Sequence, residues 1–401
     1  MTDVRPVAGV TFCPLDGNAV LFDEARQRVF HLDRLAALIW CHAAEGRGAA
    51  EIAERLCRGG VVADRVQGQA WVTDALERWR DLGLTAEDDG GPATAPLRPG
   101  VVPGAVEDHA PWPHPIPPPV ERRSYALVGT DFSVGFADAT ARDLLHPLLA
   151  HLETDGAPAS LIATDVVRAG EGYRLLAQGR VLGGCGAADE LAPLVLGEVY
   201  NLALRRVPCL LALHAGAVAT DAGGLLLSNP MGSGKSTLTA ALAACGWRFV
   251  CEDIAIIERD SLGVRPFPGC LTLRQGAWSS LAGLLPDLAS LPTHRRGGTE
   301  AVRYLPPPAT GRPARSDKPV PVRWVVFPSH GPEGEPGLVR LDKADGLRTL
   351  LANCRAVPAP LDAHAVRRLV AWAHGIEFAA LRSRTVEDAL GLIAGLTRRG
   401  P

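Results

Sequence analysis

The sequence predicts an α/β protein in which a small α+β unit and a larger α/β unit are joined by a proline-rich spacer. Two strand-like segments and three helical apolar stripes fall within the first 90 residues. Ten prolines follow between Pro92 and Pro119. Further on, an apolar strand runs directly into a glycine-rich turn and a helix, from Leu225 to Thr237. The length of 401 residues suits two or three domains of about 150 residues each.

The overall composition excludes several classes of partner and site. A formal charge of −3 gives no general attraction to nucleic acid. The basic loops at His294–Arg296 and Arg312–Arg315 are either local contacts for such a polyanion or simply solvated loops. No run of about 18 apolar residues and no signal-peptide layout occurs, so we expect no membrane partner and a cytoplasmic protein. Nine cysteines without a C-x-x-C pair argue against structural zinc and a disulfide framework.

The spacer sets the expected domain boundaries. Proline has no N–H donor and a fixed φ, so a stretch this rich in proline forms neither a helix nor a central strand. We therefore expect a first unit over 1–90, a semi-rigid linker over 91–120 and a second unit over 121–401. The apolar stripes between Val366 and Thr397 are expected to pack on the sheet of the second unit.

The first unit is expected to begin with a β-hairpin and continue with three helices. Asn18–Asp23 and Arg28–Leu32 have strand composition and flank a turn-like Glu24–Gln27. Asp33 can cap the helix that follows. The apolar stripes of the three helices are Leu35, Leu38 and Ile39; Ile52 and Leu56; and Val72, Ala75, Leu76, Trp79 and Leu82.

This order of elements resembles the PqqD-like family of peptide-recognition domains over about Val7 to Thr85. The segments that carry the resemblance are Phe30-His31-Leu32-Asp33, Ala37-Leu38-Ile39-Trp40 and Leu82-Gly83-Leu84. The resemblance implies a winged-helix-like fold that binds the leader of a ribosomally made precursor peptide as an additional strand. Carried over, the leader would bind at Gln27–Leu32 and along the exposed side of the third helix, Trp71–Arg80. The alternative is a winged-helix adaptor that contacts another domain or DNA, and the modest basic content weakens the DNA version.

Residues 229–237 have the layout of a phosphate-binding loop. Glycines let backbone N–H groups close around phosphate oxygens, Lys235 would meet the β- and γ-phosphates, and the Ser236 hydroxyl would reach Mg²⁺. Asn229 stands where the pattern has its first glycine. Because asparagine readily adopts left-handed backbone conformations, we expect the turn to be kept. The expected nucleotide-binding residues are Asn229, Gly232, Ser233, Gly234, Lys235, Ser236 and Thr237.

Two features flank the loop at informative distances. Upstream, His214 lies in the strand-like Leu213–Val218 and should lie beside the strand of the loop. Downstream, Trp247–Cys251 is typical of the next strand and ends with Glu252 and Asp253. Ligands bind at the carboxyl ends of strands in parallel α/β sheets, so these acids are candidates for binding Mg²⁺ and for accepting a hydroxyl proton.

The combination resembles the catalytic domain of HPr kinase/phosphorylase and the HPr-kinase-related peptide kinases, from about Arg122 onward. The residues that carry the resemblance are His214, Lys235, Glu252 and Asp253, within Leu213 to Ile257. The resemblance implies a P-loop phosphotransferase that uses ATP and Mg²⁺. By it, Glu252 would draw the proton from the acceptor hydroxyl, Asp253 and Ser236 would hold Mg²⁺, and His214 would orient the acids or a phosphate oxygen.

Departures from that family indicate a divergent relative. The first acid is Glu252, where the family usually has aspartate. The family's Leu-Glu-Ile-Arg-Gly element has Leu271-Thr272-Leu273-Arg274-Gln275-Gly276 as its counterpart, which keeps Arg274 and lacks the metal-assisting acid. Arg274 is either a phosphate contact or a surface arginine. The loops Thr293–Thr299 and Pro306–Pro319 are candidate lids or acceptor-binding segments, or simply surface.

Together the two resemblances imply an ATP-dependent kinase that phosphorylates a Ser or Thr of a precursor peptide held through its leader. Two alternatives stay open. One is a regulatory serine kinase of a folded carrier protein such as HPr. The other is a non-catalytic ATP-binding switch, in which Asn229 and Glu252 are substitutions that accompanied the loss of catalytic activity. The related kinases often form oligomers, and a homo-oligomer is compatible with this sequence without being fixed by it.

Overall fold

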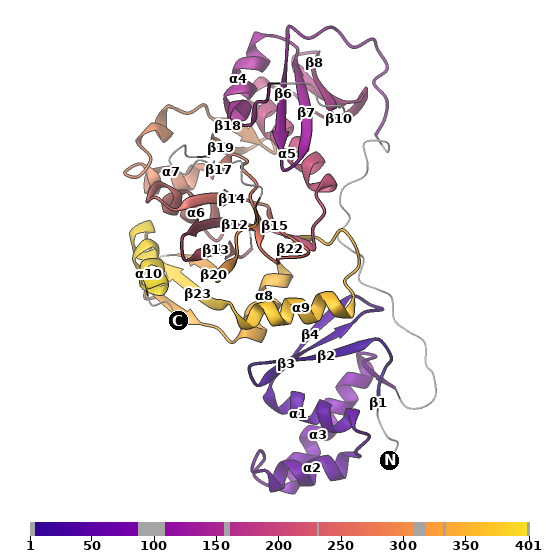
Figure 1. The fold of residues 1–401 in the computed structure, drawn as a ribbon. Coiled ribbons are helices and arrows are strands. Elements are labelled where there is room, and N and C mark those ends of the chain that lie inside the picture. Colours follow the sequence, from indigo (N-terminus) through magenta and orange to yellow (C-terminus); the bar gives the residue numbers. More distant parts are fainter. Residues whose placement is uncertain are drawn as a thin grey trace. The chain divides into compact units, whose positions relative to one another are not determined.

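The computed structural model describes residues 5–86, 109–155, 161–230, 232–307, 318–331 and 334–398. These residues form two compact units (Figure 1). The first comprises Met1–Pro99, Leu341–Ala352 and Ala359–Phe378, and the second comprises Gly100–Arg340, Asn353–Pro358 and Ala379–Pro401. Two segments expected in the second unit therefore belong to the first. Most of the expected linker, 91–108, lies outside the described residues, and 109–120 belongs to the second unit.

The first unit contains the expected hairpin within a three-stranded antiparallel sheet. Its order is β2 (Val10–Leu15), β3 (Asn18–Asp23) and β4 (Arg28–Leu32). Asp23 pairs with Arg28 at the turn, where Gln27 has a left-handed backbone with φ 52°. A second, two-stranded ladder joins β1 (Arg5–Pro6) to β5 (Thr85–Ala86).

Three helices cover one face of this sheet and share its core. They are α1 (Arg34–Ala44), α2 (Ala49–Arg58) and α3 (Arg65–Asp81). The Asp33 side chain accepts a hydrogen bond from Ala36 N at 2.8 Å, as its position predicts, and Asp64 caps α3 in the same way. Apolar residues of all three helices form one buried cluster with Ala19 and Leu21 of β3.

Two helices from late in the sequence, α8 (Lys343–Ala352) and α9 (Ala363–His374), also belong to the first unit. Helix α8 packs against β3 and β4, and α9 packs against β2 and β3. Successive strand residues point to opposite faces, and both sets in β3 are buried: Ala19 and Leu21 on one face, Val20 and Phe22 on the other. The sheet is therefore covered on both faces, which explains why β3 is apolar without alternation. The expectation that the stripe from Val366 packs on the second unit's sheet is wrong for α9.

The second unit begins with a five-stranded sheet of order β10-β9-β8-β7-β6. Neighbouring strands are antiparallel except for the parallel pair of β7 and β8. Two helices, α4 (Ala139–Leu149) and α5 (Leu191–Arg206), pack with this sheet. The strands are β6 (Glu121–Leu127), β7 (Thr130–Phe136), β8 (Ile162–Ala169), β9 (Gly172–Ala177) and β10 (Arg180–Cys185).

A six-stranded sheet of order β14-β12-β13-β20-β23-β21 forms the centre of the second unit. It is mixed, not parallel: β12 is antiparallel to both β13 and β14, whereas β13 and β20 are parallel. Strands β13, β14 and β20 therefore run in the same direction and end at the same edge. The strands are β12 (Ala215–Thr220), β13 (Gly223–Ser228), β14 (Arg248–Cys251), β20 (Val322–His330), β21 (Gly337–Arg340) and β23 (Glu377–Ser383).

Helices α6 (Lys235–Ala244) and α10 (Val386–Arg398) share an apolar core with this sheet. Helix α6 is buried on a second side against β17 (Leu271–Arg274) and α7 (Gln275–Leu281). Its many alanines suit a helix that is enclosed on two sides. At Gly216 on β12, an added Cβ would lie 2.2 Å from the Thr239 hydroxyl of α6, so glycine permits this close approach.

Two small sheets complete the second unit. One has the order β16-β15-β11-β22, and the other has the order β17-β19-β18. Their strands are β11 (Leu211–Leu213), β15 (Ala255–Ile257), β16 (Val264–Arg265), β22 (Cys354–Ala356), β18 (His294–Arg296) and β19 (Glu300–Leu305). The predicted α/β class is confirmed as a mixed α/β protein. Among the described residues, no helix combines the length and the apolar character needed to cross a membrane.

Candidate functional site

The predicted phosphate loop connects β13 to α6. Leu225, Leu226 and Leu227 are fully buried, which anchors the strand that enters the loop. Gly232 and Gly234 have left-handed backbones, with φ of 87° and 91°, and Gly234 is the N-cap of α6. Met231 lies outside the described residues. The glycines therefore serve the tight turn that their positions predicted.

Asn229 acts differently from the expectation. Its backbone is not among the left-handed residues, so the position does not need the conformational freedom of glycine. Its side-chain nitrogen instead donates a hydrogen bond to the Pro328 carbonyl at 2.7 Å, next to the end of β20. The expected left-handed turn at Asn229 is wrong, and a side-chain tether to the neighbouring strand replaces it.

Lys235 is nearly buried at the start of α6, with 7% of its surface exposed. Its Nζ donates to the carbonyl oxygens of Asn229 at 2.6 Å and Pro230 at 3.1 Å. Burial lowers the pKa of this amine, while the charges of Asp253 and Glu252 act in the opposite direction. Close by in the loop, the Ser233 hydroxyl oxygen is buried and has no hydrogen-bond partner among the residues that the structure describes. Such unsatisfied polar groups at a helix N-terminus suit an anionic ligand.

The two acids follow β14 at the sheet edge where β13 also ends. Adjacent residues of an extended strand point to opposite faces. Here Asp253 has a left-handed backbone, with φ 66°, and Ile254 N donates back to the Glu252 carbonyl at 2.8 Å. This sharp turn lets both carboxylates line the same cavity. A non-glycine residue in this conformation costs roughly 1–2 kcal/mol, which is typical of positions retained for a functional geometry.

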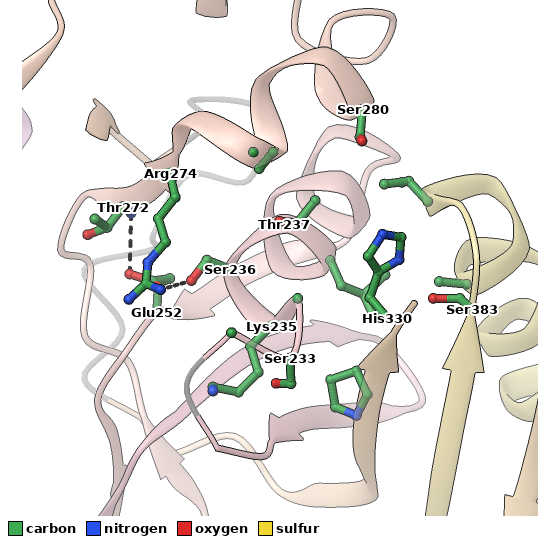
Figure 2. A pocket seen from close by; sticks show the side chains of 18 of the residues that line it. Ser233, Lys235, Ser236, Thr237, Glu252, Thr272, Arg274, Ser280, His330 and Ser383 are labelled. Atoms are coloured by element: carbon green, nitrogen blue, oxygen red, sulfur yellow. Dashed lines mark hydrogen bonds between the residues drawn. The ribbon is translucent and has the colours of Figure 1, made fainter. Parts of the chain in front are cut away.

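Glu252 is buried beside the first turn of α6. Its Oε1 accepts a hydrogen bond from the Ser236 hydroxyl at 2.5 Å, and its Oε2 accepts one from Thr272 N at 3.4 Å (Figure 2). Burial, together with the charge of Asp253, raises the pKa of this carboxyl to about 7. Ser236 was expected to share a metal with Asp253; the structure joins it to Glu252.

Asp253 is held by two cationic or polar partners. His214 Nδ1 lies 2.9 Å from its Oδ1, and Arg355 Nη1 donates to its Oδ2 at 2.9 Å. Burial opposes ionisation of Asp253, but the His214 hydrogen bond and the Arg355 charge outweigh it and hold its pKa well below the usual range. His214 lies between β11 and β12, where the chain passes from one sheet to another.

One cavity of about 260 Å³ is lined by His214, Lys235, Ser236, Glu252 and Asp253, together with Gly232, Ser233, Gly234 and Thr237. Of the described residues discussed above, Asn229 and Arg355 do not line it. Figure 2 shows Lys235, Ser236 and Glu252 at one end of this cavity and His330 and Ser383 at the other. Arg274 also lines the cavity and forms an ion pair with Glu300 at 3.0 Å, and its contact with phosphate stays a prediction.

Sequence reasoning missed His330, which lines the cavity, and Arg355, which holds Asp253, and it placed Arg296 only within a candidate loop. Arg296 ends β18 inside the stretch 293–299, which is an ordered hairpin strand and not a free loop. His330 ends β20, and its place follows only from the parallel pairing of β20 with β13. Arg355 lies on the three-residue strand β22. None of these has a local motif, and only the strand order brings them to the site. Most of the other candidate loop, 306–319, lies outside the described residues.

The expected leader-binding surface of the first unit has an open strand edge. Strand β4 pairs with β3 along one side and, within the described parts of the chain, with no strand along the other. Phe30, Leu35, Leu38 and Ala75 pack only partly buried against the core of this unit. Trp71 on α3 is 42% exposed. Unpaired backbone groups next to apolar side chains are the features that strand addition requires.

Comparison with known proteins gives limited likeness. No protein-family model matches the chain, and no curated protein matches it. A solved structure described as TbiB1 in complex with the TbiA(beta) leader peptide is 24% identical over 22% of this chain and 99% of that chain, with a TM-score of 0.20. A second, lasso peptide synthetase B1 complexed with the leader peptide, is 19% identical over 21% and 98%, also with a TM-score of 0.20. Likeness at this level carries no conclusion about activity.

Proposed function

We propose that this chain is an ATP-dependent kinase that phosphorylates a Ser or Thr hydroxyl of a ribosomally synthesised precursor peptide, which it binds through the leader. The observation that carries the proposal is the single cavity in which Lys235, Ser236, the two acids and His214 meet. Phosphoryl transfer depends on positioning and charge neutralisation more than on covalent chemistry, so a preorganised group of this kind suits it.

The loop has the features that a nucleotide triphosphate needs. The left-handed glycines suit a turn whose backbone N–H groups can face phosphate oxygens. The Ser233 hydroxyl has no hydrogen-bond partner within the described parts of the chain. Lys235 can exchange its two carbonyl contacts for phosphate oxygens. Mg²⁺ would neutralise the charge that develops on the transferred group. In our proposal Ser236 and Asp253 hold it, because Mg²⁺ usually takes one or two protein ligands and completes its shell with phosphate and water.

The acids have distinct environments, and this supports distinct roles. A base is most effective when its pKa lies near the working pH, and the raised pKa of about 7 fits Glu252 for accepting the hydroxyl proton. Asp253 is ionised and fixed by His214 and Arg355, so it offers a permanent negative charge. Ser236 can keep donating its hydroxyl proton to Glu252 while a lone pair of its oxygen binds the metal.

The allocation of the acids is testable by titrating Mg²⁺ in two variants. Asp253→Asn should raise the Mg²⁺ concentration for half-maximal activity, whereas Glu252→Gln should lower turnover by about 10²–10⁴-fold with ATP binding and the Mg²⁺ requirement kept. If Glu252→Gln raises the Mg²⁺ requirement and Asp253→Asn does not, the two acids exchange roles. If Glu252→Gln leaves function unchanged, the non-catalytic switch is the better account.

Leader binding in the first unit is proposed from the open edge of β4. An added strand would satisfy its backbone groups, and the half-buried apolar side chains beside it would select the leader sequence. Tethering a peptide in this way can raise the local concentration of its acceptor residue to about the millimolar range.

The direct experiment uses the full chain, labelled ATP and the small peptides encoded beside its gene. Label on a Ser or Thr of one such peptide, lost when its leader is removed, is the expected result. Label on a folded carrier protein and on none of the peptides would support the carrier-kinase alternative. Nucleotide binding without any transfer would support the switch.

A further inference from the structure

Between α8 and α9 the chain passes from the first unit to the second and back within one short segment. Helix α8 belongs to the first unit, β22 to the second, and α9 to the first again. One residue separates α8 from β22, and six separate β22 from α9. Because an extended residue spans at most about 3.6 Å, a shift of α8 is passed to β22 with little slack, and the six-residue link passes a shift of α9 less tightly.

In the first unit, the expected leader-binding stretch holds both helices. The Gln27 side chain makes two hydrogen bonds with the backbone of Leu361. Gln27 Nε2 donates to the Leu361 carbonyl at 2.8 Å, and the Leu361 amide donates to Gln27 Oε1 at 2.7 Å. Glu24 accepts a bond from Ala363 N, at the start of α9, at 3.2 Å. His31 lies 3.5 Å from Asp345 of α8. These contacts bracket β4, the strand with the open edge.

In the second unit, β22 holds Asp253 by two routes. Arg355 donates directly to its Oδ2 at 2.9 Å. The Asn353 carbonyl, just before β22, accepts a bond from His214 N at 2.9 Å, and His214 is the other partner of Asp253. Ladder pairing of Leu213 with Cys354 adds to this attachment. The position of β22 therefore sets both groups that orient one catalytic carboxylate.

We propose that Arg355 is a positioning residue for Asp253, and that a leader bound at the β4 edge reaches it through α8 and α9. This rests on the proposed function, since it assumes that the leader binds there. A strand added to β4 fixes the backbone of 27–32 and so favours the arrangement in which Gln27 and His31 hold the helices. The leader then activates the site as well as tethering the acceptor. Couplings between sites are typically about 5- to 150-fold.

The test separates activation from tethering by supplying the leader as a separate peptide. The probes are the synthetic leader and the leaderless core of the precursor encoded beside the gene, with the full chain and saturating ATP. We expect the leader to raise kcat for the core about tenfold, with the KM for ATP unchanged. Gln27→Ala, measured at saturating leader, should lose most of this gain.

Variants of Arg355 show whether the gain passes through this residue. Arg355→Ala should lower kcat and abolish the stimulation while ATP binding is kept, and Arg355→Lys should restore part of both. Arg58→Ala is the matched control, because this arginine of α2 is 68% exposed and forms an ion pair only with Glu54 among the described residues, so it should behave as the wild type. Stimulation that persists in Arg355→Ala, or a leader that acts only when fused to the core, would overturn the proposal. Absence of any transfer by the wild type would instead refute the proposed function.

Discussion

Glu252 makes the stability of the metal-free protein depend on pH, and its environment sets the size of the effect. Its pKa rises from 4.5 to about 7 on folding because the carboxyl is buried next to Asp253. The folded protein therefore binds this proton more tightly than the unfolded chain does. The resulting stability is fully present below pH 4.5 and is lost as the pH rises through 7. A difference of about 2.5 units at 1.36 kcal/mol each corresponds to roughly 3 kcal/mol.

Thermal unfolding in EDTA without nucleotide, followed by calorimetry between pH 5 and 8, measures this loss. For a unit of this size, roughly 3 kcal/mol corresponds to a fall in Tm of about 6–12 °C. Asp253 adds nothing to this slope because its pKa is held well below the range tested. Glu252→Gln keeps a carbonyl that can accept from Ser236 and removes the titration, so its Tm should change much less with pH.

The comparison depends on the slope with pH and not on the absolute Tm. Glu171→Gln is the control, because Glu171 is solvent-exposed in a turn of the same unit. It should follow the wild-type curve. If Glu252→Gln shows the same slope as the wild type, the carboxyl is not buried against Asp253 and the geometry assigned to the site is wrong.

Three further predictions follow from single contacts. Lys235→Met should weaken ATP binding about 10- to 100-fold, as measured by calorimetry, because it removes a charge-assisted contact to phosphate; unchanged affinity would exclude a phosphate role for this lysine. Asn229→Gly should lose the bond to Pro328 and about 1 kcal/mol of stability, with no gain in ATP affinity; tighter ATP binding would show that the turn needs glycine after all. Trp71→Ala should weaken binding of a labelled leader about tenfold in fluorescence anisotropy with ATP affinity kept, and leader binding equal to that of the wild type would place the peptide elsewhere.

Local features of the fold could be predicted because local chemistry decides them. Asp33 caps α1 through a bond three residues away, and the hairpin of β3 and β4 closes over a four-residue turn. The loop glycines have the backbone that their spacing required. The sequence also predicts one site for Lys235, Ser236, Glu252 and Asp253. Lys235 and Ser236 follow β13 and the two acids follow β14, and the helix that connects these strands makes them run in the same direction.

The parts of the fold and the site that could not be predicted depend on contacts between segments far apart in the sequence. Strand β22 has three residues and no periodic pattern, so nothing in its sequence places Arg355 beside Asp253. Helix α9 has an ordinary amphipathic stripe that fits any apolar sheet face equally well. The sheet that it covers is determined by contacts between residues more than 300 positions apart in the sequence, such as Gln27 and Leu361. The role of Asn229 was misjudged because its partner, Pro328, lies on another strand.

The coverage of β3 on both faces also constrains the order in which the chain can fold during synthesis. The first strands leave the ribosome early, but α8 and α9, which pack on the face of Val20 and Phe22, are translated more than 300 residues later. At roughly 5–20 residues per second, this apolar face of the sheet therefore stays exposed for about 16–70 s during synthesis. A nascent chain of this protein should therefore be a client of chaperones until residue 378 has emerged. A fragment ending near residue 90 should be recovered poorly unless 341–378 is supplied with it.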